Sequence, residues 1–191
     1  NNARLFDATL KQQKTQILYK AGELTAAGVS AGSIRAIRFF IEKHSTRAFK
    51  NLNIKMAQTD LSNLAENGSI RYAGNMTTVL SLPSYITVNG WNVFTLTQPF
   101  SWNGTSNIAL ELCFDNGTAT AGKADIIYAY SDGSNEDEGS MIEDATVNCT
   151  ENFALVGFYS DGVKPIMMLD YTMRGNSVEN AIAVSKEANL G

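Results

Sequence analysis

The chain of 191 residues has one histidine, two cysteines and three prolines, and no apolar run long enough to span a bilayer. Because His44, Cys113 and Cys149 are the whole supply, a zinc site built from histidine and cysteine is nearly excluded. A catalytic triad would have to use His44, and the sequence has no Gly-x-Ser-x-Gly motif. Nothing singles out a pair of carboxylates for glycoside hydrolysis. We therefore predict that the chain is not an enzyme.

Positive charge is also limited, with 15 Lys and Arg residues against 19 Asp and Glu and a formal net charge of −4. Without a basic stripe that could release counterions from phosphates, nucleic acid is not an expected partner. The composition, 44% hydrophobic and 18% charged, is that of a globular protein. A chain of this length can bury about 70% of its unfolded surface, so it needs neither metal nor disulfide to fold.

Most of the chain consists of short strand patterns separated by turn residues, which predicts an all-β, antiparallel, jelly-roll-like sandwich. In the segment 52–56, Leu52, Ile54 and Met56 alternate with polar residues, so one face is buried and the other faces solvent. The segment 108–114 alternates as well, and we expect Ala109, Glu111 and Cys113 to point outward. Further strands are expected at residues 15–19, 33–41 (with a β-bulge between Ile34 and Ile37), 76–82, 91–97, 124–130, 153–159 and 166–173.

One segment breaks the strand pattern, and the two ends of the chain also differ from the middle. Residues 21–28 predict a short helix that ends at Gly28 and packs over one end of a sheet. We expect the sandwich domain to span residues 15–173, with an N-terminal extension at 1–14 and a C-terminal extension at 174–191. The weak alternation at Ile182 and Val184 suits an edge strand or a strand exchanged with a neighbouring copy.

The abundance of Thr, Ser, Asn and Gly is typical of secreted β proteins, so we expect an extracellular or cell-surface location. The chain begins with Asn1 rather than Met, which suggests a removed leader or a piece of a longer protein. Cys113 and Cys149 form one disulfide or remain two buried thiols, and the sequence leaves both open. Five Asn-x-Ser/Thr sequons are candidate glycosylation sites, although Asn-Gly turn chemistry explains several of them: Asn67, Asn75, Asn103, Asn116 and Asn148.

The densest cluster of acidic residues lies between Asp132 and Asp144, where six carboxylates fall within thirteen positions. Crowded oxygen ligands on a loop suit Ca²⁺, and the candidate ligands are Asp132, Asn135, Asp137 and Glu138. A solvated acidic loop is the commoner reading of such a run. If the loop holds Ca²⁺, adding the ion should raise the melting temperature, and no shift at millimolar Ca²⁺ would refute the idea.

Aromatic side chains are the second candidate for a binding site. Trp91, Trp102 and Tyr85 are suited to a platform for sugar rings, because aromatic faces match the apolar side of a pyranose. The same residues are ordinary core material, and for the two tryptophans the core interpretation is the stronger.

Several motifs occur in the order found in a known domain. The segments that carry the similarity are Gln16-Ile17-Leu18-Tyr19, Glu23-Leu24-Thr25-Ala26-Ala27-Gly28, Gly32-Ser33-Ile34, residues 49–56, Gly90-Trp91-Asn92-Val93-Phe94, residues 99–108, residues 111–116 and Lys164-Pro165-Ile166. From residue 15 to about 173 the chain resembles a β-sandwich domain that recurs in surface and type IX-secreted proteins of Bacteroidetes. The resemblance implies an extracellular jelly-roll-like module. The chain departs from the family by lacking a visible type IX sorting domain and a catalytic module.

These features lead to three expectations about function. The first is a non-catalytic module that binds a carbohydrate or protein surface, as in an adhesin. The second is a structural subunit of a surface filament, in which the terminal extensions join copies of the chain. The third is an accessory domain of a secreted hydrolase. None of them requires insertion into a membrane.

Overall fold

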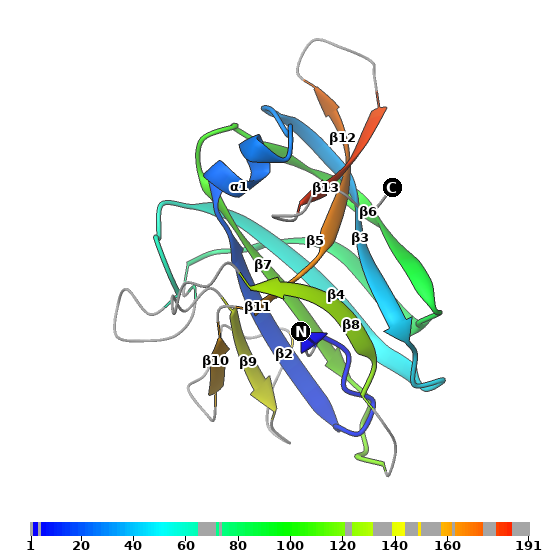
Figure 1. Cartoon of the computed structure of the whole chain (residues 1–191). Helices are drawn as coiled ribbons and strands as arrows, with labels where there is room; N and C mark the ends of the chain where they lie inside the picture. The colour runs from blue at the N-terminus through cyan, green and yellow to red at the C-terminus, as the bar shows by residue number, and fades with distance from the viewer. Residues whose placement is uncertain are drawn as a thin grey trace.

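The protein folds into two antiparallel β-sheets that face each other, with a single short helix in the described part of the chain (Figure 1). This computed structural model describes residues 2–3, 5–64, 72, 74–120, 124–131, 139–143, 149, 158–161, 163–173 and 179–184. The predicted all-β sandwich with one helix near residues 21–28 is confirmed.

Each sheet collects strands that are distant in the sequence. Sheet A contains β1 (Asn2–Ala3), β3 (Gly32–Lys43), β6 (Gly90–Trp102), β8 (Ile126–Ser131), β11 (Val163–Pro165), β12 (Met167–Met173) and β13 (Glu179–Val184). Sheet B has the order β10 (Phe158–Asp161), β9 (Gly139–Glu143), β2 (Gln12–Tyr19), β7 (Asn107–Asp115), β4 (Ala48–Thr59) and β5 (Thr77–Ile86). Between β2 and β9, every connection except β4–β5 passes from one sheet to the other, as expected of a jelly-roll-like sandwich.

Two local predictions are confirmed in detail. Strand β3 has a register shift against β6 between Ile34 and Ala36, where the β-bulge was expected. Helix α1 (Ala21–Ala26) ends in a Schellman motif, because the N–H of Gly28 donates to the carbonyl of Thr25 and that of Val29 donates to the carbonyl of Leu24. Gly28 has φ +89°, which explains why glycine stands there.

The core lies between the sheets and includes a cluster of phenylalanines. The Phe6 ring lies 5.1 Å from that of Phe49 and 5.9 Å from that of Phe94, and Phe49 packs on Phe114 at 4.9 Å. Phe6 belongs to the segment expected to be an extension, and β2 itself begins at Gln12. Part of residues 1–14 is therefore built into the sandwich.

The outer faces of the two sheets differ. On β7 both faces are buried, so Ala109, Glu111 and Cys113, which were predicted to point outward, lie under other parts of the chain. On β6, by contrast, outward residues such as Trp91, Val93 and Thr95 are exposed. The outer face of sheet A is thus open to solvent along β6, whereas the outer face of sheet B is covered along β7.

Candidate functional site

Three aromatic side chains form a row across the outer face of sheet A, one from each of three strands. Trp91 on β6 and Tyr128 on β8 flank Phe40 on β3, and each ring centroid lies 5.4 Å from that of Phe40. Trp91 is 36% exposed and Tyr128 is 43% exposed, while Phe40 is half-buried between them. We call these three residues the aromatic row.

Strand alternation places the aromatic row on the outside. Phe39 and Ile41, which flank Phe40, are completely buried in the core, and so is Ile127 next to Tyr128. Phe40 is the register partner of Trp91, so their side chains leave the sheet on the same face.

The backbone around Trp91 is held by the buried side chain of Asn92. Its Oδ1 accepts from the N–H of Val88 at 2.9 Å, and its Nδ2 donates to the carbonyls of Val88 at 2.7 Å and Gly90 at 3.0 Å. Gly90 has φ +97°, so the turn that leads into Trp91 requires glycine. The exposed indole therefore stands on a fixed turn.

The next rung of the same face carries an ion pair. Arg38 lies two residues before Phe40 on β3 and is the register partner of Val93. Its Nη2 and Nε donate to Oδ2 of Asp170 on β12 at 2.5 and 3.2 Å. Side chains of Arg38 and Asp170 are 31% and 26% exposed, so the pair borders the aromatic row at the surface.

The structure separates the three aromatic residues proposed from the sequence. Only Trp91 is exposed. Trp102 is buried and its Nε1 donates to the carbonyl of Ser106 at 2.7 Å, while the ring of Tyr85 packs on Phe94 at 4.8 Å. Trp102 and Tyr85 therefore do not join Trp91 at the surface: Trp102 is buried, as the core interpretation expected, and Tyr85 packs against the core residue Phe94.

Sequence reasoning missed Phe40 and Tyr128, although a signal for each was present. In Ile37-Arg38-Phe39-Phe40-Ile41 the two phenylalanines must point to opposite faces, and the one in phase with Arg38 faces outward. Tyr128 is likewise out of phase with the buried Ile127.

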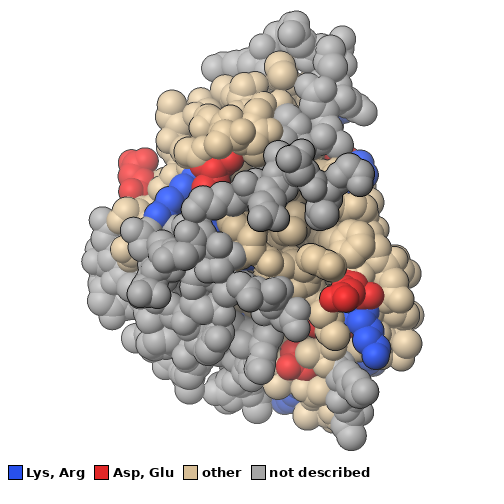
Figure 2. Space-filling model, in the orientation of Figure 1, with Lys and Arg blue, Asp and Glu red and all other residues tan. Residues whose placement is uncertain are grey.

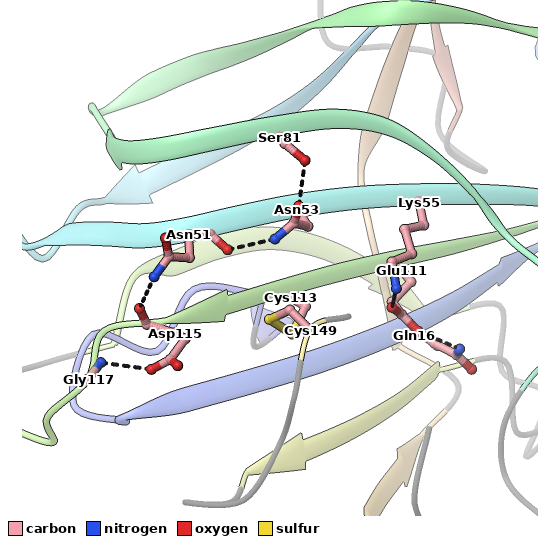
Figure 3. The surroundings of a disulfide bond; sticks show 10 residues. All are labelled: Gln16, Asn51, Asn53, Lys55, Ser81, Glu111, Cys113, Asp115, Gly117 and Cys149. Carbon is pink, nitrogen blue, oxygen red and sulfur yellow. Dashed lines mark hydrogen bonds and ion pairs between the residues drawn. A yellow bond between two sulfur atoms is a disulfide. The ribbon is translucent and has the colours of Figure 1, made fainter. Parts of the chain in front are cut away.

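Cys113 on β7 is joined to Cys149 by a disulfide, the first of the two alternatives left open by the sequence (Figure 3). The Cα atoms lie 5.5 Å apart, and both residues are buried. Because Cys113 points away from the core, the bond fixes Cys149 against the outer face of sheet B.

Beside the disulfide, a polar layer crosses the outer face of sheet B. Lys55, Glu111 and Gln16 lie in line on β4, β7 and β2 (Figure 3). Glu111 is buried; its Oε1 is 3.4 Å from Nζ of Lys55, and its Oε2 accepts from Gln16 at 2.9 Å. Gln16 also exchanges hydrogen bonds with the backbone N–H and carbonyl of Tyr72 at 2.8 and 3.2 Å. These contacts hold the backbone at Tyr72 over the sheet, so we assign this polar layer a structural role.

His44 lies in a polar cluster where the β3–β4 and β5–β6 turns meet the start of β8. The buried Asp125 accepts the N–H of Ser45 at 2.7 Å, and the N–H of His44 donates to Oδ1 of Asn89 at 2.9 Å. Burial raises the pKa of Asp125 above its usual range, and the Ser45 N–H offsets part of that rise.

A second buried charge lies beneath helix α1. Lys164 on β11 is completely buried, and its Nζ is 2.5 Å from Oε1 of Glu23. The hydroxyl of Tyr130 donates to the same oxygen at 3.0 Å, and Lys164 lies 5.9 and 5.6 Å from the ring centroids of Tyr19 and Tyr130. Burial raises the pKa of Tyr19, whose hydroxyl donates to the carbonyl of Pro165. The cluster fastens the helix to both sheets.

The calcium ligands predicted at Asp132, Asn135, Asp137 and Glu138 lie outside the described residues, as do the sequons at Asn67 and Asn148. Within the described part of the chain, no three His, Cys, Asp or Glu side chains could together hold a metal ion. Asn75 and Asn103 are exposed.

The surroundings of Asn116 are unfavourable for glycosylation. Asn116 is buried, its Nδ2 donates to the carbonyl of Leu10 at 3.3 Å, and its Oδ1 accepts from the N–H of Lys50 at 3.0 Å. A glycan on that nitrogen would break the hydrogen bond to the carbonyl of Leu10, so in this fold Asn116 bridges Leu10 and Lys50.

The expected edge strand near Ile182 and Val184 is present as β13, which pairs with β12 at one edge of sheet A. The strand is thus seated within its own chain. No helix in the described residues has the length and hydropathy of a membrane span.

Charges of the described residues are scattered over the face seen in Figure 2, with blue and red side chains next to each other in several places. No protein-family model, curated protein or solved structure matches the chain. The similarity to the Bacteroidetes surface domain therefore remains a prediction from the motifs alone.

Proposed function

We propose that the chain is a non-catalytic extracellular module that binds a carbohydrate or protein surface through the outer face of sheet A. The observation that carries the proposal is the aromatic row of Trp91, Phe40 and Tyr128, which is exposed and packed ring against ring. Large aromatic side chains dominate the energetics of interfaces when they are desolvated by a partner.

The construction of the face supports binding rather than accidental exposure. Three neighbouring strands hold the rings, and Asn92 fixes the turn before Trp91, so little conformational entropy would be lost when a ligand binds. Of the five large hydrophobic residues that are exposed in the described chain, Trp91, Val93 and Tyr128 belong to this face. A contiguous exposed apolar patch on a monomer marks an interaction site more often than a scattered residue does.

An extracellular location is supported by the disulfide between Cys113 and Cys149. Disulfides of this structural kind persist in oxidising compartments and are rare where thiols are kept reduced.

The test is adsorption of the purified chain to wells coated with soluble polysaccharides, native mucin, deglycosylated mucin and collagen. We expect the wild type to bind at least one coating, and Trp91→Ala with Tyr128→Ala to bind it at least about tenfold more weakly. Ile86→Ala is the matched control, because Ile86 is 55% exposed but lies on β5 of the other sheet. Equal adsorption of the wild type and the double variant to every coating would refute the proposal.

A further inference from the structure

We infer that the ligand of the aromatic row is a single, neutral, soluble polysaccharide chain rather than a crystalline polysaccharide or a protein. This inference rests on the proposed function and specifies the chemistry of the same face. Four features of the described residues carry it: the angles between the rings, their spacing, the ion pair on the next rung, and the charged groups close to the apolar surface.

The angles between the rings show that Phe40 does not lie in one plane with either of its neighbours. Trp91 stands at 83° to Phe40, and Tyr128 stands at 79° to it. A crystalline polysaccharide presents a plane of sugar rings, and its binding requires aromatic faces that lie in one plane. The aromatic row can instead stack one sugar on an exposed face and contact its neighbour with a ring edge, which suits a chain free to twist.

The spacing of the rings fits successive sugar units. Because the row runs across the strands, its rings are separated by about the distance between neighbouring strands, 4.7–4.9 Å, and the measured centroid separations are 5.4 Å. That separation is close to the length of one pyranose unit in an extended chain. A polysaccharide lying across β6, β3 and β8 would therefore meet one ring per sugar.

The ion pair supplies directed hydrogen bonds without net charge. Arg38 places Nη2 and Nε on one oxygen of Asp170, and Nη1 has no partner among the described residues. A guanidinium held in this way presents a fixed donor to a sugar hydroxyl. Asp170 neutralises Arg38, so this rung has no unpaired cation that would select an acidic polysaccharide. The exposed Glu42, two residues after Phe40 on β3, would repel an acidic chain.

Charged side chains lie close to the aromatic row, which is unfavourable for the centre of a stable protein interface. A specific interface buries about 800 Å² on each partner, with charged residues depleted at its centre. Here the rung next to the aromatic row contains the Arg38–Asp170 ion pair beside the exposed Val93, so charged groups lie within one rung of the rings. An aromatic strip bordered by hydrogen-bonding groups matches a sugar chain better.

The experiment is affinity gel electrophoresis of the full chain in gels that contain soluble β-glucan, mannan, xylan, galactan or polygalacturonate, together with sedimentation on crystalline cellulose and crystalline chitin. We expect retardation by at least one neutral polysaccharide, no retardation by polygalacturonate beyond that in a plain gel, and no sedimentation with either crystalline solid. Raising NaCl from 50 to 500 mM should change the dissociation constant less than about twofold, because no net charge is neutralised.

Variants separate stacking from hydrogen bonding. Trp91→Ala should weaken retention about tenfold or more, Trp91→Phe should restore part of it, and Ile86→Ala should leave it unchanged. Arg38→Lys keeps the charge opposite Asp170 but loses the fork, so it should weaken retention several-fold. Melting curves of each variant identify any that fail to fold.

The outcomes distinguish this inference from the function it rests on. Trp91-dependent binding to crystalline solid, polygalacturonate or deglycosylated protein alone overturns the inference and leaves the binding module standing. Absence of retardation in all neutral gels also overturns the inference. Adsorption that never depends on Trp91, in gels and on every coated well, overturns both.

Discussion

Removal of the disulfide between Cys113 and Cys149 should destabilise the fold by an amount that follows from its position in the sequence. The two residues are 36 positions apart. The loss of loop-closure entropy in the unfolded chain, taken as 2.1 + 1.5R ln n cal/mol/K, gives about 3.8 kcal/mol at 25 °C for a loop of that length. Since small domains are stable by about 5–15 kcal/mol in total, this single bond would supply a large part of the stability.

The perturbation is the double variant Cys113→Ala with Cys149→Ala, measured against the oxidised wild type by guanidinium unfolding. Unfolding is followed by far-UV circular dichroism and by tryptophan fluorescence, to which the buried Trp102 contributes a signal from the core. The denaturant concentration at the midpoint should be lower for the double variant than for the wild type. We expect a loss of 3–4 kcal/mol, close to the entropic figure. A second control is the wild type with its disulfide reduced, which should unfold at a similar midpoint.

Two results would refute this reasoning. A thiol titration that finds two free cysteines in the unfolded, non-reduced chain would show that the bond does not form in solution. A loss below about 1 kcal/mol with the bond present in the wild type would mean that the unfolded chain keeps the two segments close together without it.

Three further predictions concern buried polar groups. Burial raises the pKa of Asp125 in the folded state, so the free energy of unfolding of the wild type should fall relative to that of Asp125→Asn as pH rises from about 4 through the raised pKa. Urea unfolding at several pH values measures this difference, and a rise in the relative stability of the wild type would contradict the prediction. Lys164→Met should cost about 3–5 kcal/mol, since it leaves Glu23 without its cation, and adding Glu23→Gln should recover part of the loss in the melting temperature. After secretion from a glycosylating host, mass spectrometry should find Asn116 unmodified, because its amide nitrogen is engaged by Leu10; an occupied Asn116 in folded protein would disprove this placement.

The alternation of apolar and polar residues predicted the strands well, because a strand with one buried face has an apolar residue at every second position. The pattern Leu52, Ile54 and Met56 appears as the buried face of β4, and the slip between Ile34 and Ile37 appears as a break in the β3–β6 register. Helix α1 was also predictable, since Gly28 marks the point where a left-handed residue ends it.

The outer faces were not predictable by the same means. Alternation says which residues leave the core side of a sheet but not what covers them, so Glu111 and Cys113 were expected at the surface and are buried. For the two tryptophans the core interpretation was favoured; Trp102 is buried as expected, whereas Trp91 is exposed, because composition does not distinguish a core aromatic residue from one on a binding face. Pairing across strands decides between these cases, and Phe40 joins Trp91 only through the register of β3 with β6.

The difference in burial between the outer faces of the two sheets is an argument for a ligand on sheet A. Over sheet B the chain fastens Tyr72 and Cys149, and it pairs Glu111 with Lys55 and Gln16 beneath them. If the chain covered the rings on sheet A, folding would gain roughly 25 cal/mol for each Å² of apolar surface removed from water. Because Trp91 and Tyr128 are exposed, the fold does not gain this free energy. A partner that desolvates Trp91 and Tyr128 would gain it instead, which is what a binding face requires.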